Sequence, residues 1–103
     1  MRIEDLRTFI TIIDEGNVSK AGKALGVKQQ TISKRLAALE GELGHELLKR
    51  DRGGCFLTPF GKEVQKHAKK ILKAQEKLER SKPALAVIEL EQNLTDYASE
   101  YIE

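Results

Sequence analysis

The sequence has little of what large or cross-linked proteins are built from. Its 103 residues include no Trp, only 5% aromatic residues and a single cysteine, Cys55. One cysteine excludes an internal disulfide framework and fits a reducing cytoplasm. No apolar run approaches the roughly 18 residues of a membrane span, and the opening MRIEDL lacks the core of a signal peptide. What remains is one domain's worth of chain, enough for a core of three or four helices and marginal for a deep substrate pocket.

Charge is plentiful but unevenly distributed. Charged residues make up 33% of the sequence, and the formal net charge is +2. Residues 1–83 hold 18 Lys and Arg against 11 Asp and Glu, a net charge of +7, whereas residues 84–103 hold five acidic residues and no basic one. A basic body favours a polyanionic partner, because lysines and arginines that neutralise phosphates release condensed counterions. The acidic segment cannot help such binding and is expected to point elsewhere.

Two helices and a turn are predicted before residue 28. Apolar residues at helical spacing predict a helix over 3–15, which Gly16-Asn17 ends. Ser19 is the expected N-cap of a short helix over 20–25. Gly26 then supplies a tight turn, expected at positive φ, and returns the chain to the core.

The third helix, expected over about 29–41, has two unlike sides. The inner side is a narrow apolar stripe made of Ile32, Leu36, Leu39 and Leu43. The outer side carries amide, hydroxyl, ammonium and small groups: Gln30, Lys34, Ala37 and Gly41, flanked by Thr31, Ser33 and Ala38. No carboxylate lies on this outer side, because Glu40 and Glu42 lie toward its flanks.

A hairpin is predicted next. The segments 47–50 and 55–57 are short strand candidates on either side of Asp51-Arg52-Gly53-Gly54, a turn signal. Thr58-Pro59 follows, an N-cap with proline at the first helical position, and it opens a long helix to about Ser81.

The long helix has one apolar seam. The seam includes Phe60, Val64, Ile71 and Leu78. Because little of the domain remains to cover it, its simplest partner is a second copy of the same helix. Packing within the chain, against residues 3–13 or the C-terminal segment, is the alternative.

Pro83 is expected to break or restart the long helix. Beyond it, apolar residues at helical spacing predict a second amphipathic, acidic helix over 84–103, and a strand over 84–90 is the competing interpretation. The predicted organisation is therefore 1–58 for the helices and hairpin, 59–82 for the linker and dimerisation helix, and 83–103 for the acidic segment.

A short helix, a glycine turn and a helix with a carboxylate-free outer face make a helix-turn-helix, and the hairpin makes it winged. An α-helix fits the major groove of DNA, where amide, hydroxyl and basic groups pair with base edges and phosphates. The hairpin carries Lys49, Arg50 and Arg52, which suit phosphates or the neighbouring minor groove. The predicted fold is mostly α: a winged helix-turn-helix with a small β-hairpin wing and a long C-terminal dimerisation helix.

From Leu6 to Gly61 the sequence resembles the N-terminal DNA-binding region of LysR-type transcriptional regulators. The most specific pieces are the turn residues Ala21, Leu25, Gly26 and Val27, the pairs Leu39-Glu40 and Leu43-Gly44, and Leu47-Leu48-x-Arg50 followed by Leu57-Thr58-Pro59-x-Gly61. Including the linker helix, the resemblance covers about the first 80 residues.

The resemblance implies roles for individual residues. Because members of the family read DNA with the start of the third helix, it implies base-edge roles for Gln29, Gln30, Ser33 and Lys34, with Thr31 and Arg35 near the DNA backbone. It also implies wing contacts from Arg50 and Arg52, and homodimerisation over residues 59–80 through Phe60, Val64, Ile71 and Leu78.

Two departures from the family pattern matter. The family usually has Ser-Gln-Pro where this chain has Lys28-Gln29-Gln30, so an N-cap serine and an N1 proline are both missing. Losing the cap costs roughly 1 kcal/mol of helix stability, but Lys28 can add a phosphate contact. The family's ligand-sensing domain is also expected to be absent from this chain, and with it any small-molecule inducer site.

Several of these features also have a purely structural interpretation. The outer face of the third helix can be an ordinary solvated face, and so can the lysines of the long helix. Cys55 is either a redox-sensing thiol near Arg50 and Arg52 or simply a small strand residue. His45 and His67 have no second ligand at metal-binding spacing, so neither a metal nor a cofactor is expected. No nucleophile–base–acid set appears, so an enzyme is not expected.

The leading hypothesis is a stand-alone, cytoplasmic and nucleoid-associated regulator that binds double-stranded DNA as a homodimer. The rival is a protein-interaction module, dominant-negative or antirepressor, that pairs with full-length regulators through the long helix. A third interpretation is the excised DNA-binding domain of a longer regulator, which the polar, helical character of residues 95–103 disfavours.

Overall fold

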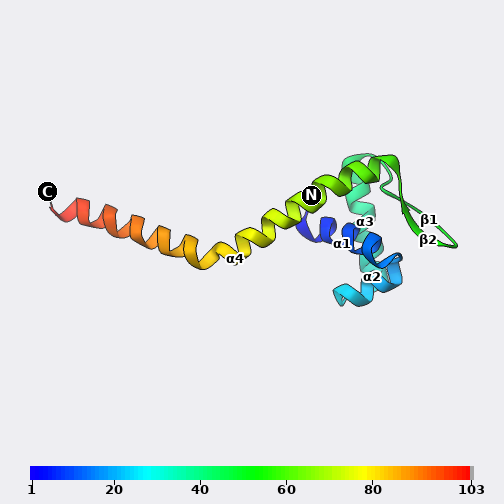
Figure 1. Cartoon of the computed structure of the whole chain (residues 1–103), viewed down its shortest axis with the longest axis horizontal. Coiled ribbons are helices and arrows are strands. Elements are labelled where there is room, and N and C mark those ends of the chain that lie inside the picture. Colours follow the sequence, from blue (N-terminus) through cyan, green and yellow to red (C-terminus); the bar gives the residue numbers. More distant parts are fainter. Residues whose placement is uncertain (103) are drawn as a thin grey trace. The chain divides into compact units, whose positions relative to one another are not determined.

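The computed structural model describes the backbone of residues 1–102 and the side chains of residues 1–84 and 87–92. The elements are α1 (Ile3–Glu15), α2 (Val18–Leu25), α3 (Gln29–Leu43), β1 (Leu48–Asp51), β2 (Gly54–Leu57) and α4 (Pro59–Ile102). This mostly helical fold with one two-stranded antiparallel hairpin confirms the predicted fold class (Figure 1). The chain divides into two units, Met1–Leu72 and Lys73–Glu103.

The first unit is built around one hydrophobic core. Its largest fully buried apolar side chains come from α1, α3 and the segment before β1: Phe9, Ile12, Ile32, Leu39 and Leu47. Burying each of these side chains contributes about 1.5–3 kcal/mol, so the core is what holds α1 and α3 together. The apolar stripe predicted for α3 is confirmed, since Ile32, Leu36 and Leu39 are its buried residues.

The helix-turn-helix is set by caps and glycines. Gly16 ends α1 at φ 88°, and Gly26 ends α2 at φ 69°, the predicted left-handed turn. The expectation that Ser19 caps α2 is wrong: Asn17 Oδ1 accepts a hydrogen bond from Lys20 N–H at 2.8 Å. Asn17 both follows the end of α1 and starts α2, which makes this connection shorter than the sequence alone indicated.

The third helix begins as predicted and runs two residues further, to Leu43. Lys28 occupies its N-cap position, and the lysine side chain makes no capping hydrogen bond. At the other end Gly44 adopts φ 79°, and its N–H donates to the Glu40 carbonyl at 2.8 Å. A glycine C-cap of this kind stops the helix one turn before the hairpin.

The hairpin is docked on the end of α1. Leu48 pairs with Leu57 and Arg50 with Cys55, which leaves Arg52-Gly53 as the turn. Cys55 N–H donates to the carbonyl of Gly16 at 3.2 Å, so β2 is docked on the end of α1. Figure 1 shows the hairpin projecting from the three N-terminal helices as a wing.

The start of α4 completes the first unit. Thr58 is its N-cap as predicted, since Thr58 Oγ1 accepts from Gly61 N–H at 2.9 Å. Three apolar residues of the first turns pack against the core of the same unit: Val64, Ala68 and Leu72. Gly61 is buried at this contact, where a Cβ would overlap the carbonyl oxygen of Leu47.

The helix end expected near Ser81 is wrong, and so is a strand over 84–90. Helix α4 continues through Pro83 to Ile102. Proline removes one backbone hydrogen bond, but its fixed φ is helical, and the Ala, Leu and Glu residues that follow are strong helix formers. In the part of the chain that the structure describes, no helix is long and apolar enough to cross a membrane.

Candidate nucleic-acid interface

The start of α3 presents polar and basic groups to the outside. Lys28, Gln29, Gln30 and Lys34 are exposed, while Thr31 and Ser33 are half-buried beside them. The first turn of α3 contains no acidic residue. Because the N-terminus of a helix carries a partial positive charge, the macrodipole adds to these side chains in favouring an anion.

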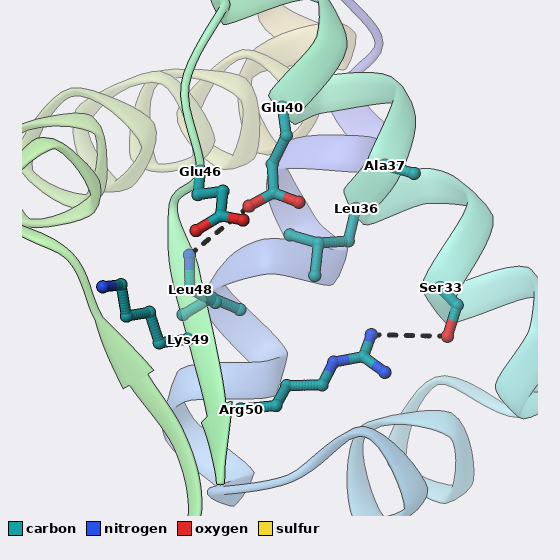
Figure 2. A pocket seen from close by; sticks show the side chains of 8 residues that line it. All are labelled: Ser33, Leu36, Ala37, Glu40, Glu46, Leu48, Lys49 and Arg50. Atoms are coloured by element: carbon teal, nitrogen blue, oxygen red, sulfur yellow. Dashed lines mark hydrogen bonds between the residues drawn. The ribbon is translucent and has the colours of Figure 1, made fainter.

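The wing brings one arginine to this helix. Side chains alternate along β1, so Leu48 and Arg50 face α3 while Lys49 points to the other side (Figure 2). Leu48 is buried in the core, and two residues further Arg50 Nη2 donates to Ser33 Oγ at 3.4 Å. The pleat of the strand therefore places a guanidinium beside the exposed start of α3.

Two open grooves meet at Arg50. One, of about 490 Å³, runs between α3 and β1 and is lined by Ser33, Leu36, Ala37, Glu40, Glu46, Leu48, Lys49 and Arg50 (Figure 2). The other, of about 300 Å³, lies between the starts of α2 and α3 and the wing, and its lining includes Gln29, Arg50 and Cys55. Arg50 thus lines both grooves, with Ser33 in the larger one and Gln29 in the smaller one.

Of the two carboxylates in the larger groove, Glu46 is exposed and Glu40 is engaged inside the protein. Glu40 Oε2 accepts from Leu47 N–H at 2.7 Å. It also accepts from Leu48 N–H at 3.5 Å (Figure 2). These two contacts hold the first residues of the wing against the last turns of α3. Glu40 therefore positions β1 and, through it, Arg50.

The other two predicted arginines lie elsewhere. Arg35 is half-buried on the α1 side of α3, where Nη1 donates to Oγ1 of the fully buried Thr8 at 3.4 Å. Arg52 is exposed in the turn of the hairpin. Arg52 is thus available at the tip of the wing, whereas Arg35 helps to fix α3 to α1.

The residues predicted for dimerisation have unlike surroundings. Val64 packs partly against the core of its own unit, whereas Phe60, Ile71 and Leu78 are 36%, 38% and 55% exposed. The ring of Phe60 also contacts that of His45, with centroids 4.8 Å apart. Three of the four seam residues therefore offer apolar surface to the outside.

The contacts that join the wing to α3 could not be predicted from the sequence. Arg50 and Ser33 are 17 residues apart, and Glu40 is seven residues from Leu47. No local pattern signals such pairs. Cys55 is half-buried and free, and among the residues that the structure describes no three His, Cys, Asp or Glu side chains form a group able to hold a metal ion.

A helix-turn-helix whose second helix has an acid-free start, beside an arginine-bearing hairpin, defines a winged helix-turn-helix protein. The family model for bacterial regulatory helix-turn-helix proteins of the lysR family matches residues 3–62. The chain belongs to this LysR family.

Similarity to curated proteins supports this family membership. The chain is 38% identical over 91 residues to the uncharacterized HTH-type transcriptional regulator YvbU of Bacillus subtilis, and the match covers 87% of the chain and 31% of YvbU. It is 43% identical over 72 residues to a probable hydrogen peroxide-inducible genes activator of Mycobacterium avium, covering 70% and 23%. The matches thus span between 23% and 31% of the length of these relatives.

Solved structures extend the similarity to isolated domains bound to DNA. The complex of the CbnR DNA-binding domain with DNA matches with a TM-score of 0.74 and 36% identity, covering 82% of this chain and 99% of that one. The complex of the BenM DNA-binding domain with catB site 1 DNA matches with a TM-score of 0.78 and 29% identity, covering 84% and 94%. The chain therefore carries the winged helix-turn-helix DNA-binding domain of LysR-type transcriptional regulators.

Proposed function

We propose that this protein binds double-stranded DNA sequence-specifically, as a homodimer, and thereby regulates transcription at the nucleoid in the bacterial cytoplasm. The observation that carries the proposal is that Arg50 joins Ser33 and lines a groove with Gln29 at an acid-free helix start. The DNA complexes of CbnR and BenM, to whose binding domains this chain is similar, support it.

The recognition helix is α3, with its first turns in the major groove. Base-edge contacts fall to Gln29, Gln30, Ser33 and Lys34, since amides pair with adenine and an ammonium with guanine. Lys28 and Thr31 are assigned to phosphates. Arg35 is assigned to the DNA backbone as well, and its hydrogen bond to Thr8 supports a role that is mainly orienting.

The wing is assigned to the DNA backbone and the adjacent minor groove. Arg52, in the exposed turn, would contact a phosphate without reading sequence. Arg50 sits closer to α3 and would contact the same stretch of DNA as Ser33. Arg52 at the tip of the wing therefore adds affinity for DNA, and Arg50 helps to position the protein on the DNA.

Dimerisation is assigned to the 59–82 segment of α4. The exposed apolar side chains of Phe60, Ile71 and Leu78 support it, because a second copy would remove them from water. Two recognition helices would then enter successive major grooves on an inverted-repeat site. Residues 1–58, 59–82 and 83–103 would serve for DNA binding, dimerisation and an additional contact.

The decisive experiment is selection of random duplexes by the purified chain, followed by a salt titration of the selected site. We expect an inverted repeat, and an affinity whose logarithm falls with log[salt] at roughly 0.9 per phosphate neutralised. Absence of binding to any duplex at low salt would refute the proposal. It would favour the rival hypothesis, an interaction module that pairs with full-length regulators through α4. The same exposed apolar residues of α4 are consistent with that module.

A further inference from the structure

One large apolar side chain lies exposed on the wing. Within the described residues 1–58 the only exposed large apolar side chains are Met1 and Phe56, and Phe56 is 51% exposed. The exposed apolar residues from Phe60 onward belong to α4. Because scattered apolar surface is ordinary in proteins, the surroundings of Phe56 decide what its ring can bind.

The ring of Phe56 reaches the turn of the hairpin. Phe56 pairs with Lys49 across the two strands, so both side chains lie on the face of the hairpin opposite to that of Arg50. A Cβ added to Gly53 would lie 3.5 Å from Cζ of Phe56. The far edge of the ring therefore lies beside Gly53, at the end of the wing that also carries Arg52.

The charges around the ring favour a polyanion. Residues 48–57 contain three basic side chains and one acidic side chain, a net charge of +2, and Lys49 and Arg52 are both exposed. The acidic side chain, Asp51, is turned onto the hairpin itself, where Oδ1 accepts from Gly53 N–H at 2.7 Å. An apolar ring with cations at its edges fits a partner that offers apolar atoms between anionic groups.

We propose that Phe56 is a DNA-contacting residue of the wing, whose ring packs against deoxyribose carbons in the minor groove while Arg52 contacts a neighbouring phosphate. The minor groove has the required composition, because deoxyriboses form its walls and phosphates its rims. Apolar side chains such as Phe enter this groove in other DNA-binding proteins. The inference rests on the proposed function and deepens it, because it adds an apolar contact to the cationic contacts assigned to the wing.

The salt dependence of binding distinguishes an apolar contact from an ionic one. Affinity gained by neutralising phosphates falls as the salt concentration rises, whereas affinity gained by covering apolar surface does not. Phe56→Ala is therefore expected to weaken binding to the selected site by about threefold to tenfold and to leave the salt slope unchanged. Arg52→Ala is the matched control on the same wing, and it should reduce the slope by about 1. Fluorescence anisotropy across a salt titration measures both variants.

Hydroxyl-radical cleavage of the bound duplex locates the contact. The radical removes hydrogen atoms from deoxyriboses that are accessible in the minor groove, so a ring packed on these sugars protects them. In the minor groove next to the bases that α3 reads, Phe56→Ala should restore cleavage that the parent chain suppresses. Phe56→Leu retains apolar surface and should restore less cleavage. Circular dichroism of the full chain shows that each variant is folded.

Three results would overturn the inference while the proposed function stands. The first is parent-like DNA affinity of Phe56→Ala; a change in its sedimentation would then assign the ring to a protein contact. The second is weaker binding with a reduced salt slope, as expected of a purely structural role, because a loosened turn would also misplace Arg52. The third is unchanged protection of the sugars. Failure of the parent chain to bind any duplex would refute the proposed function, and this inference with it.

Discussion

Arg50 Nη2 lies 3.4 Å from Ser33 Oγ and donates a hydrogen bond to it, joining the wing to the recognition helix. A serine hydroxyl has one proton and two lone pairs, so a guanidinium on one lone pair turns the proton away from Arg50. In the proposed complex this proton is free to donate to a base or phosphate. The two residues are therefore expected to act on DNA as one unit.

That coupling is measurable by a double-mutant cycle. Ser33→Ala and Arg50→Ala should each weaken binding to the selected site, and the double variant should lose less than the sum by about 0.5–3 kcal/mol. The control cycle pairs Ser33→Ala with Lys49→Ala, whose side chain points to the other side of β1 (Figure 2). Losses that add in both cycles would show that the wing and α3 bind independently.

Variants of Lys34 and Arg52 distinguish sequence recognition from non-specific affinity for DNA. Lys34→Ala should cost roughly 1–3 kcal/mol on the selected site and relax the preference at one base pair, because an ammonium in the major groove reads a base edge. Arg52→Ala should weaken all duplexes alike and reduce the salt slope by about 1. Fluorescence anisotropy on matched and mismatched duplexes measures both. Unchanged affinity and preference for Lys34→Ala would contradict the assignment of α3 as the recognition helix.

Ile71 tests the dimer seam. Ile71→Glu places a charge on an exposed apolar position of α4, where dimerisation would have to desolvate it. Sedimentation should show that the dimer dissociation constant rises by roughly tenfold or more. Ala24→Glu adds the same charge on an exposed position of α2 and should leave the dimer intact. An unaffected Ile71→Glu dimer would remove residue 71 from the interface.

Two glycines inside helices should respond to alanine with opposite signs. Gly61→Ala would push a Cβ into the carbonyl oxygen of Leu47, which accepts a hydrogen bond from Thr58 N–H, so a loss of about 1–3 kcal/mol in unfolding free energy is expected. At Gly41 a Cβ meets open space, and Gly41→Ala should raise the unfolding free energy by about 0.5–1 kcal/mol. Urea unfolding decides both. Equal effects would contradict the close contact at Gly61.

The N-cap of α2 is tested by a further pair of variants. Asn17→Ala removes the acceptor of Lys20 N–H and should lower the unfolding free energy by about 1 kcal/mol. Ser19→Ala changes an exposed side chain and should stay within about 0.5 kcal/mol of the parent. Urea unfolding of both variants under one set of conditions gives the comparison. A larger loss for Ser19→Ala would restore serine as the cap.

Local patterns were sufficient for most of the fold. The glycines at 16 and 26 mark turns because a left-handed φ favours the residue without a Cβ, and the stripe of Ile32, Leu36 and Leu39 follows from the helical period. The predicted end of the long helix was wrong because proline disfavours the interior of a helix without excluding it. Pro83 removes a single hydrogen bond, and strong helix formers beyond it sustain the helix.

By itself, then, the sequence determined the order of elements, the acid-free face of α3 and the opposite charges of α4. These depend on residues close together in the chain, whose spacing has a fixed geometric meaning. Only the tertiary structure decided that Arg50 reaches Ser33, that Glu40 holds the start of the wing and that Arg35 turns toward Thr8. Such contacts join residues seven to 27 positions apart, and their partners are set by how the core places whole elements.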